Sequence, residues 1–189
     1  AVCDIAKRYE CLGREINDVI WEYAEAGMKE YRSAEYYVKK FEELSFSVER
    51  GAAGIPTAFV ASWGEGKPVI GFLAEYDAVS GVSQAAGVAR QQPLICGGPG
   101  HGCGHNLLGA GSLGAALAVK EYLEATGRPG RVMLFGCPAE EGGAGKGFMA
   151  RDGVFDEADC AFTWHPADIN AVTRDSSLAN VQLTFRFTG

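Results

Sequence analysis

Three short apolar runs constrain the fold of this chain most strongly. They cover residues 69–74, 132–135 and 158–163, and stretches with helical spacing of apolar residues separate them. Runs that are apolar throughout are typical of strands covered on both faces, as in a parallel sheet. Strands that alternate with helices indicate such a sheet with helices packed on it. The sequence therefore predicts an α/β fold.

The remaining elements follow from periodicity and from turn residues. A strand is expected over 57–63, and the turn sequence Gly64-Glu65-Gly66 predicts a hairpin between it and the run at 69–74. Helical spacing of apolar residues predicts helices over 4–26, 33–44, 107–125 and 146–151. Gly127 is expected to end the helix over 107–125.

The C-terminal residues have a different pattern. Residues 178–187 alternate between apolar and polar side chains, which predicts a half-exposed strand. This change indicates a domain boundary near Ser176. We therefore expect residues 1–176 to form one domain and residues 177–189 to begin a second one, so that the chain is a fragment of a longer protein.

Composition excludes several classes of protein. The formal net charge is −7 and no basic run is present, which argues against nucleic-acid binding. No apolar stretch reaches the roughly 18 residues of a membrane span, and the N-terminus lacks a signal-peptide layout. The six cysteines form no CxxC pair, which argues against a zinc ribbon or a disulfide scaffold. We expect a cytoplasmic protein that does not bind membranes.

Residues that bind metal ions or transfer protons follow each apolar run. The carboxyl ends of parallel strands meet at one edge of an open α/β sheet, so we expect these side chains to share a cleft. Adjacent side chains diverge, so one of the two neighbouring glutamates can bind a metal while the other acts as a general base. The residues are Glu75 and Asp77, then Glu140 and Glu141, then His165.

A glycine-rich segment over 98–109 supplies a further candidate metal site. Cys103 and His105 are two positions apart, so on an extended backbone they point the same way and can bind one ion. For His101 the sequence leaves ligation, orientation of a ligand and loop structure open.

The same region contains a second motif, Gly109-Ala-Gly111-Ser-Leu-Gly114, which has the GxGxxG spacing of dinucleotide-binding loops. No strand precedes it, and Leu134 stands where an acidic residue would be expected. We therefore rank a nucleotide-binding oxidoreductase low, and expect the glycines to let a helix pack closely on the sheet.

Four short motifs together resemble the M20 metallopeptidase family, in particular its amidohydrolase branch with the aminobenzoyl-glutamate utilisation group and related dipeptidases. The motifs are Ala74-Glu-Tyr-Asp77, Gly102-Cys-Gly-His-Asn106, Pro138-Ala-Glu-Glu141 and Trp164-His-Pro166. The resemblance implies a three-layer α/β/α zinc-peptidase-like catalytic domain, incomplete here, followed by the first strand of an α+β dimerisation (lid) domain.

The resemblance also implies roles for individual residues. Cys103, His105, Glu141 and His165 correspond to metal ligands, Glu140 to the general base, and Asp77 to an acid that orients a ligand. Glu75 stands where the family varies and receives no role. Asn106 replaces the aspartate of many members of the branch, which bears on local hydrogen bonding and substrate preference.

The implied activity is hydrolysis of an amide bond by a metal-activated water. The implied cofactors are two divalent metal ions, Zn or Mn, and the implied substrates are small amides such as N-acyl amino acids, p-aminobenzoyl-glutamate or dipeptides. The family has a last metal-binding histidine after the lid domain, which these 189 residues do not contain, so we expect the fragment alone to be inactive. A homodimer or a related subunit would associate through the lid domain. The alternative is a non-catalytic metal-binding or partner subunit.

Overall fold

The computed structural model describes residues 2–172, 176, 181 and 183–188. Its strands are β1 (Ser47–Arg50), β2 (Phe59–Glu65), β3 (Val69–Ala74), β4 (Gly130–Gly136) and β5 (Cys160–Phe162). Its α-helices are α1 (Val2–Ala6), α2 (Glu10–Tyr23), α3 (Tyr31–Glu43), α4 (His105–Thr126) and α5 (Gly145–Arg151), and two 3-10 turns are η1 (Lys7–Tyr9) and η2 (Ala52–Gly54).

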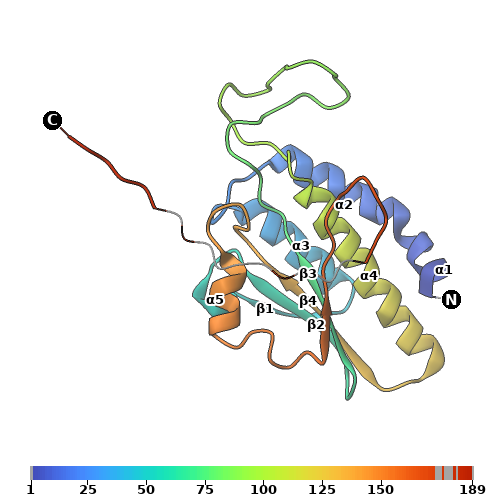
Figure 1. The fold of residues 1–189 in the computed structure, drawn as a ribbon. Coiled ribbons are helices and arrows are strands. Elements are labelled where there is room, and N and C mark those ends of the chain that lie inside the picture. Colours follow the sequence, from blue (N-terminus) through green and yellow to red (C-terminus); the bar gives the residue numbers. More distant parts are fainter. Residues whose placement is uncertain (1, 173–175, 177–180, 182, 189) are drawn as a thin grey trace.

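Within the described residues the strands form a single mixed sheet in the order β1-β2-β4-β3-β5. β3 runs parallel to both β4 and β5, whereas β2 is antiparallel to β1 and β4. The long helix α4 makes the crossover from β3 to its parallel neighbour β4 (Figure 1). The predicted α/β fold is confirmed, and the three apolar runs form its parallel strands.

The predicted hairpin between residues 57–63 and 69–74 is wrong. β4 lies between β2 and β3 and pairs with both along its length. β4 is buried at almost every position. Its central position in the sheet explains this burial, because its backbone pairs with a strand on each side and both of its faces are covered. On its way from β2 to β3 the chain passes close to the first residue of β4. A Cβ atom on Gly64 would lie only 2.5 Å from the carbonyl oxygen of Gly130.

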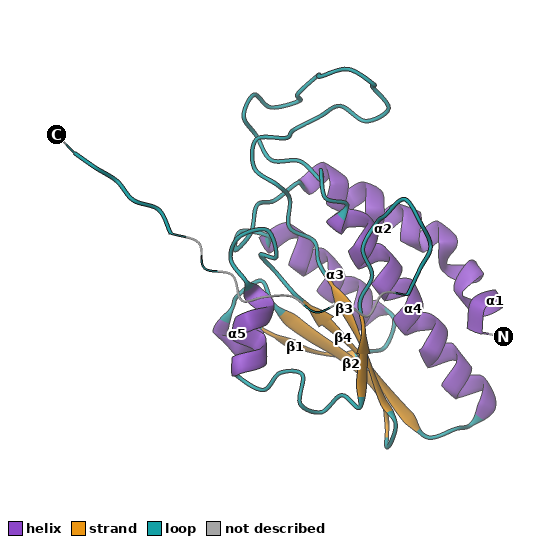
Figure 2. Cartoon of the chain, viewed as in Figure 1, coloured by secondary structure: helices purple, strands orange, loops and turns teal. Residues whose placement is uncertain are grey.

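Alternate side chains of β4 point into two separate cores. Val132 and Leu134 belong to the core formed with α2, α3 and α4, and Met133 and Phe135 belong to the core that includes Met149 of α5. Figure 2 shows the strands between α5 on one side and the other α-helices on the other. The structure is therefore three-layered, with most of its helices on one face.

The predicted strand over 178–187 lies partly outside the described residues. Residues 181 and 183–187 are described and belong to no strand, so a domain boundary near Ser176 stays a prediction. No helix in the described part of the chain is both long and apolar enough to span a membrane.

The glycines of the GxGxxG motif differ in their surroundings on α4. A Cβ atom on Gly109 would lie 2.3 Å from the Tyr37 hydroxyl oxygen and 2.7 Å from the backbone oxygen of Glu75. Gly111 lies against the Trp164 ring, whereas Gly114 has no described atom within 4 Å of such a Cβ. Gly109 thus lets the first turns of α4 approach the end of β3, as the sequence predicted.

We predict that Gly109→Ala lowers the free energy of unfolding by about 1–3 kcal/mol, because the added methyl group overlaps buried backbone and Tyr37. Gly114→Ala on the same helix is the matched control and should be neutral or stabilising by up to about 1 kcal/mol, because alanine favours helix. Urea denaturation measures both. Equal effects of the two substitutions would contradict the close approach at Gly109.

Candidate metal centre

The predicted site residues meet at the carboxyl ends of β3, β4 and β5. Asp77 follows β3, His105 is the first residue of α4, and His165 follows β5. Glu140 and Glu141 lie in the turn between β4 and α5. Parallel strands bring these segments, almost 90 residues apart in the sequence, to one edge of the sheet.

A buried pair, Asp77 and His105, joins β3 to α4. The imidazole Nδ1 of His105 lies 2.9 Å from Asp77 Oδ1, and both side chains are fully buried. The second oxygen of Asp77, Oδ2, accepts the backbone N–H of Glu141 at 2.9 Å. Because Asp77 accepts a hydrogen bond from the Nδ1–H group, the other ring nitrogen, Nε2, is left to bind a ligand.

Carboxylate oxygens surround His105 Nε2. Glu75 Oε2 lies at 3.0 Å, Glu140 Oε2 at 3.7 Å and Glu141 Oε1 at 3.8 Å. Within the described residues, His105 Nε2 and Glu75 Oε2 are buried and have no hydrogen-bond partner. Such atoms are costly to bury. A cation between them would satisfy both, so the residues fit a metal ion.

Cys103 and His165 form the other side of the centre. Cys103 Sγ lies 3.1 Å from His165 Nε2. Trp164 fixes the segment by donating its indole N–H to the Leu108 carbonyl at 3.1 Å, and Pro166 packs against Gly104, whose left-handed backbone (φ 85°) begins α4. His165 is thus fixed on both sides by contacts with the start of α4.

Two overlapping groups of ligand atoms result, each with its members within 4.8 Å of one another. His105 belongs to both, so a pair of ions could share this edge of the sheet. Among the described residues the groups are Cys103, His105 and His165, and Glu75, His105 and Glu140.

The charges around His105 favour a bound cation. Burial acts to raise the pKa of Asp77, but hydrogen bonds from His105 and from the Glu141 N–H hold it below its usual value. Burial acts to lower the pKa of His105, but Asp77 and the neighbouring glutamates outweigh it and raise this pKa. Burial, followed by the Glu141 carboxylate, raises the pKa of the Cys103 thiol to about 12. A cation would stabilise the thiolate.

His101 lies outside both groups of ligand atoms. Its ring is buried, and Nε2 donates to the carbonyl oxygen of Ile20 at 3.0 Å. Burial lowers the pKa of His101 to about 4, so the ring is neutral. Of the roles left open by the sequence, the structure thus shows His101 attaching the glycine-rich segment to α2.

Glu30 is a site-supporting residue that the sequence did not reveal. Its fully buried carboxylate accepts the backbone N–H of Ala139 at 2.8 Å and the hydroxyl of Thr57 at 3.1 Å. Ala139 has a positive φ of 56° and directly precedes Glu140. Burial raises the pKa of Glu30 despite these hydrogen bonds. Nothing local in the sequence distinguishes Glu30 from the exposed glutamates near it.

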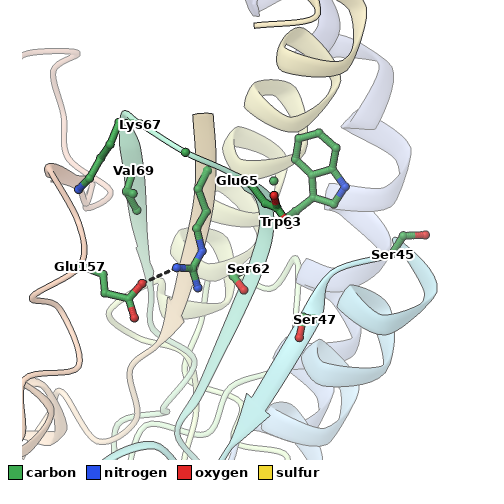
Figure 3. Close-up of a pocket in the computed structure, with 11 residues that line it drawn as sticks. Ser45, Ser47, Ser62, Trp63, Glu65, Lys67, Val69 and Glu157 are labelled. Atoms are coloured by element: carbon green, nitrogen blue, oxygen red, sulfur yellow. Dashed lines mark hydrogen bonds and ion pairs between the residues drawn. The ribbon is translucent and has the colours of Figure 1, made fainter. Parts of the chain in front are cut away.

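A large cavity among the described residues, shown in Figure 3, is lined by none of the residues that follow the carboxyl ends of the parallel strands. It measures about 930 Å³ and is lined by residues near the amino ends of β3 and β4, including Trp63, Lys67 and Arg131, which forms an ion pair with Glu157. None of the candidate metal ligands lines it. The candidate metal ligands and this cavity are therefore at different places on the sheet.

Comparison with known proteins agrees with this geometry. The model of the family described as "Peptidase family M20/M25/M40" matches residues 71–178, more than half of the chain. The chain belongs to this family. The match covers the carboxyl ends of β3, β4 and β5, and thus the motifs that carried the resemblance.

Two curated relatives are similar over most of the chain. It is 49% identical over 175 residues to a subunit of p-aminobenzoyl-glutamate hydrolase from Escherichia coli (strain K12), which covers 93% of this chain and 36% of that protein. It is 32% identical over 185 residues to Xaa-Arg dipeptidase of Homo sapiens, covering 89% of this chain and 37% of that protein. The chain thus spans little more than a third of these relatives' length.

Solved structures share the fold. The Bacillus subtilis YXEP protein, described as a dinuclear metal-binding peptidase of the M20 family, superposes with a TM-score of 0.66 at 21% identity over 85% of this chain and 44% of that one. The aminobenzoyl-glutamate utilization protein of Klebsiella pneumoniae superposes with a TM-score of 0.62 at 18% identity, with the same coverage. The predicted catalytic-domain fold is confirmed.

We predict that Glu30→Ala lowers the free energy of unfolding by about 1–3 kcal/mol, because the buried Ala139 N–H and Thr57 hydroxyl lose their acceptor. Glu30→Gln keeps the shape and an acceptor oxygen, so it should retain most of the stability. Thermal and urea unfolding measure the difference. If both variants unfold like the wild type, the contacts of Glu30 do not support the turn before Glu140.

Proposed function

We propose that the complete protein is a metal-dependent amidohydrolase that cleaves an amide bond in a small substrate. The observation that carries this proposal is the pair of ligand groups that share His105 at the carboxyl edge of the sheet. Membership of the M20 family supports the reaction class. Catalytic groups at this edge are usual in open α/β folds.

The proposed cofactors are two divalent metal ions. Cys103, His105, Glu141 and His165 would hold them, with Asp77 orienting His105. Glu141 is outside both groups of ligand atoms, but its Oε1 lies 3.8 Å from His105 Nε2. A thiolate, two imidazoles and a carboxylate form a donor set suited to zinc, and manganese is the alternative. Such ions polarise a carbonyl group and make a nearby water more acidic.

We assign the proton transfers to Glu140. Its side chain is 44% exposed, whereas the side chain of Glu75 is 7% exposed, so Glu140 is accessible to a substrate. Its carboxylate is also 3.7 Å from His105 Nε2, beside the proposed metal centre. In this role Glu140 accepts a proton from the attacking water and donates it to the leaving amine.

The names of the relatives support a proposal for the substrate class. Their names describe hydrolysis of p-aminobenzoyl-glutamate and of Xaa-Arg dipeptides. These compounds share an amide bond to an amino acid that bears a carboxylate. We propose that this protein acts on amides of the same kind, and a panel of N-acyl amino acids, dipeptides and p-aminobenzoyl-glutamate would identify the substrate.

Association with a second subunit is part of the proposal. The Escherichia coli relative is named as a subunit of a hydrolase. A homodimer or a pair of related subunits would fit, with residues 177–189 beginning the domain through which they associate. Several apolar side chains of the described C-terminal residues are exposed, namely Val181, Leu183, Phe185 and Phe187.

We predict that Glu140→Gln in the complete protein lowers kcat by about 100-fold or more and leaves the metal content unchanged, because Glu140 is assigned as the base while Cys103, His105, Glu141 and His165 are assigned as the ligands. Cys103→Ala and His165→Ala should instead lower the bound metal. Elemental analysis and amide hydrolysis assays measure both properties. Full activity of Glu140→Gln would refute the role of Glu140 as the base. A wild-type protein that binds metal but hydrolyses none of the substrates in the panel would indicate a non-catalytic subunit.

A further inference from the structure

Glu75 is a buried acid that the sequence places among the residues able to bind metal or transfer protons, but to which the family resemblance gave no role. It follows the last residue of β3 and its side chain is 7% exposed. One carboxylate oxygen, Oε1, forms an ion pair with the ammonium group of Lys146 on α5. The other oxygen, Oε2, is buried and has no hydrogen-bond partner in the described part of the protein.

This oxygen faces a second buried atom that also has no hydrogen bond to any described residue, and the two form an ion pair when His105 is protonated. Glu75 Oε2 lies 3.0 Å from His105 Nε2, which is also buried without a hydrogen bond among the residues described. Leaving a buried carboxylate oxygen and a buried ring nitrogen unsatisfied costs free energy. An oxygen and a nitrogen that converge in this way are two donor atoms suited to one divalent cation.

Lys146 makes Glu75 suited to this position. The ammonium group compensates part of the negative charge at the site, and it restrains the carboxylate through Oε1 so that Oε2 is directed to His105. Partners of this kind orient the ligands of metal sites and tune their affinity. The exposed Glu140 carboxylate lies within 4.8 Å of the same two atoms, so the general base faces the ion that they would hold.

We propose that Glu75 is a ligand of the metal centre, binding with His105 the ion that faces Glu140, and that Lys146 positions Glu75. The inference rests on the proposed function, because it adds a ligand to the same centre. The competing explanation is a purely structural ion pair, in which Glu75 balances the charges of Lys146 and His105 and binds no metal.

Measuring zinc binding to the metal-free complete protein distinguishes the metal-ligand explanation from the structural ion pair. Zn²⁺ is titrated in competition with a chromophoric chelator, and elemental analysis gives the stoichiometry. The variants are Glu75→Gln and, as a matched control, Glu65→Gln, which changes an exposed glutamate at the end of β2. The double variant Glu75→Gln/Lys146→Met removes both charges of the pair, and it carries the test if Glu75→Gln alone does not fold.

We expect the wild type and Glu65→Gln to bind two ions with equal affinities. Glu75→Gln and the double variant should bind one of the two at least about tenfold more weakly, with the other unchanged. Wild-type affinities at both sites in the Glu75 variants would overturn the inference and leave the proposed function standing. A wild-type protein that binds no zinc or manganese would overturn both.

Discussion

The hydrogen bond between Asp77 and His105 fixes the geometry of the proposed metal centre. Asp77 follows β3, His105 begins α4, and neither is exposed to solvent. The same carboxylate accepts the N–H of Glu141 from the turn after β4, so it joins three segments that the sequence separates widely. By occupying Nδ1, Asp77 leaves Nε2 of His105 directed to Glu75, Glu140 and Glu141. These carboxylates lie within 3.8 Å of that nitrogen.

The arrangement carries an excess of negative charge. Around His105 the structure gathers the carboxylates of Glu75, Asp77, Glu140 and Glu141, while Lys146 is the lysine that pairs with one of them. Like charges this close repel each other and oppose folding. A protein retains such a cluster where a cation compensates it, and divalent ions are the largest local charges available. Electrostatics and ligand geometry thus favour the same conclusion.

Much of this could be predicted from sequence because the signals were local. The apolar runs at 69–74 and 132–135 identified parallel strands, and strand ends identified where Glu140 and His165 would meet. The hairpin was wrong because strand order depends on β4, which follows almost sixty residues after β3 (130 minus 74). Glu30 and Lys146 were missed for the same reason: their partners, Ala139 and Glu75, are distant in sequence, and nothing in their own neighbourhood predicts burial or pairing.

Anomalous X-ray diffraction at the zinc absorption edge, from crystals of the complete protein grown with Zn²⁺, tests most directly whether these strand ends bind metal. We expect two peaks at the carboxyl edge of the sheet. One peak should lie about 2.0–2.3 Å from ligand atoms of Cys103 and His165. The other should lie at the same distance from His105 Nε2 and a carboxylate oxygen of Glu75. Peaks elsewhere on the protein, with none beside His105, would contradict the metal centre described above.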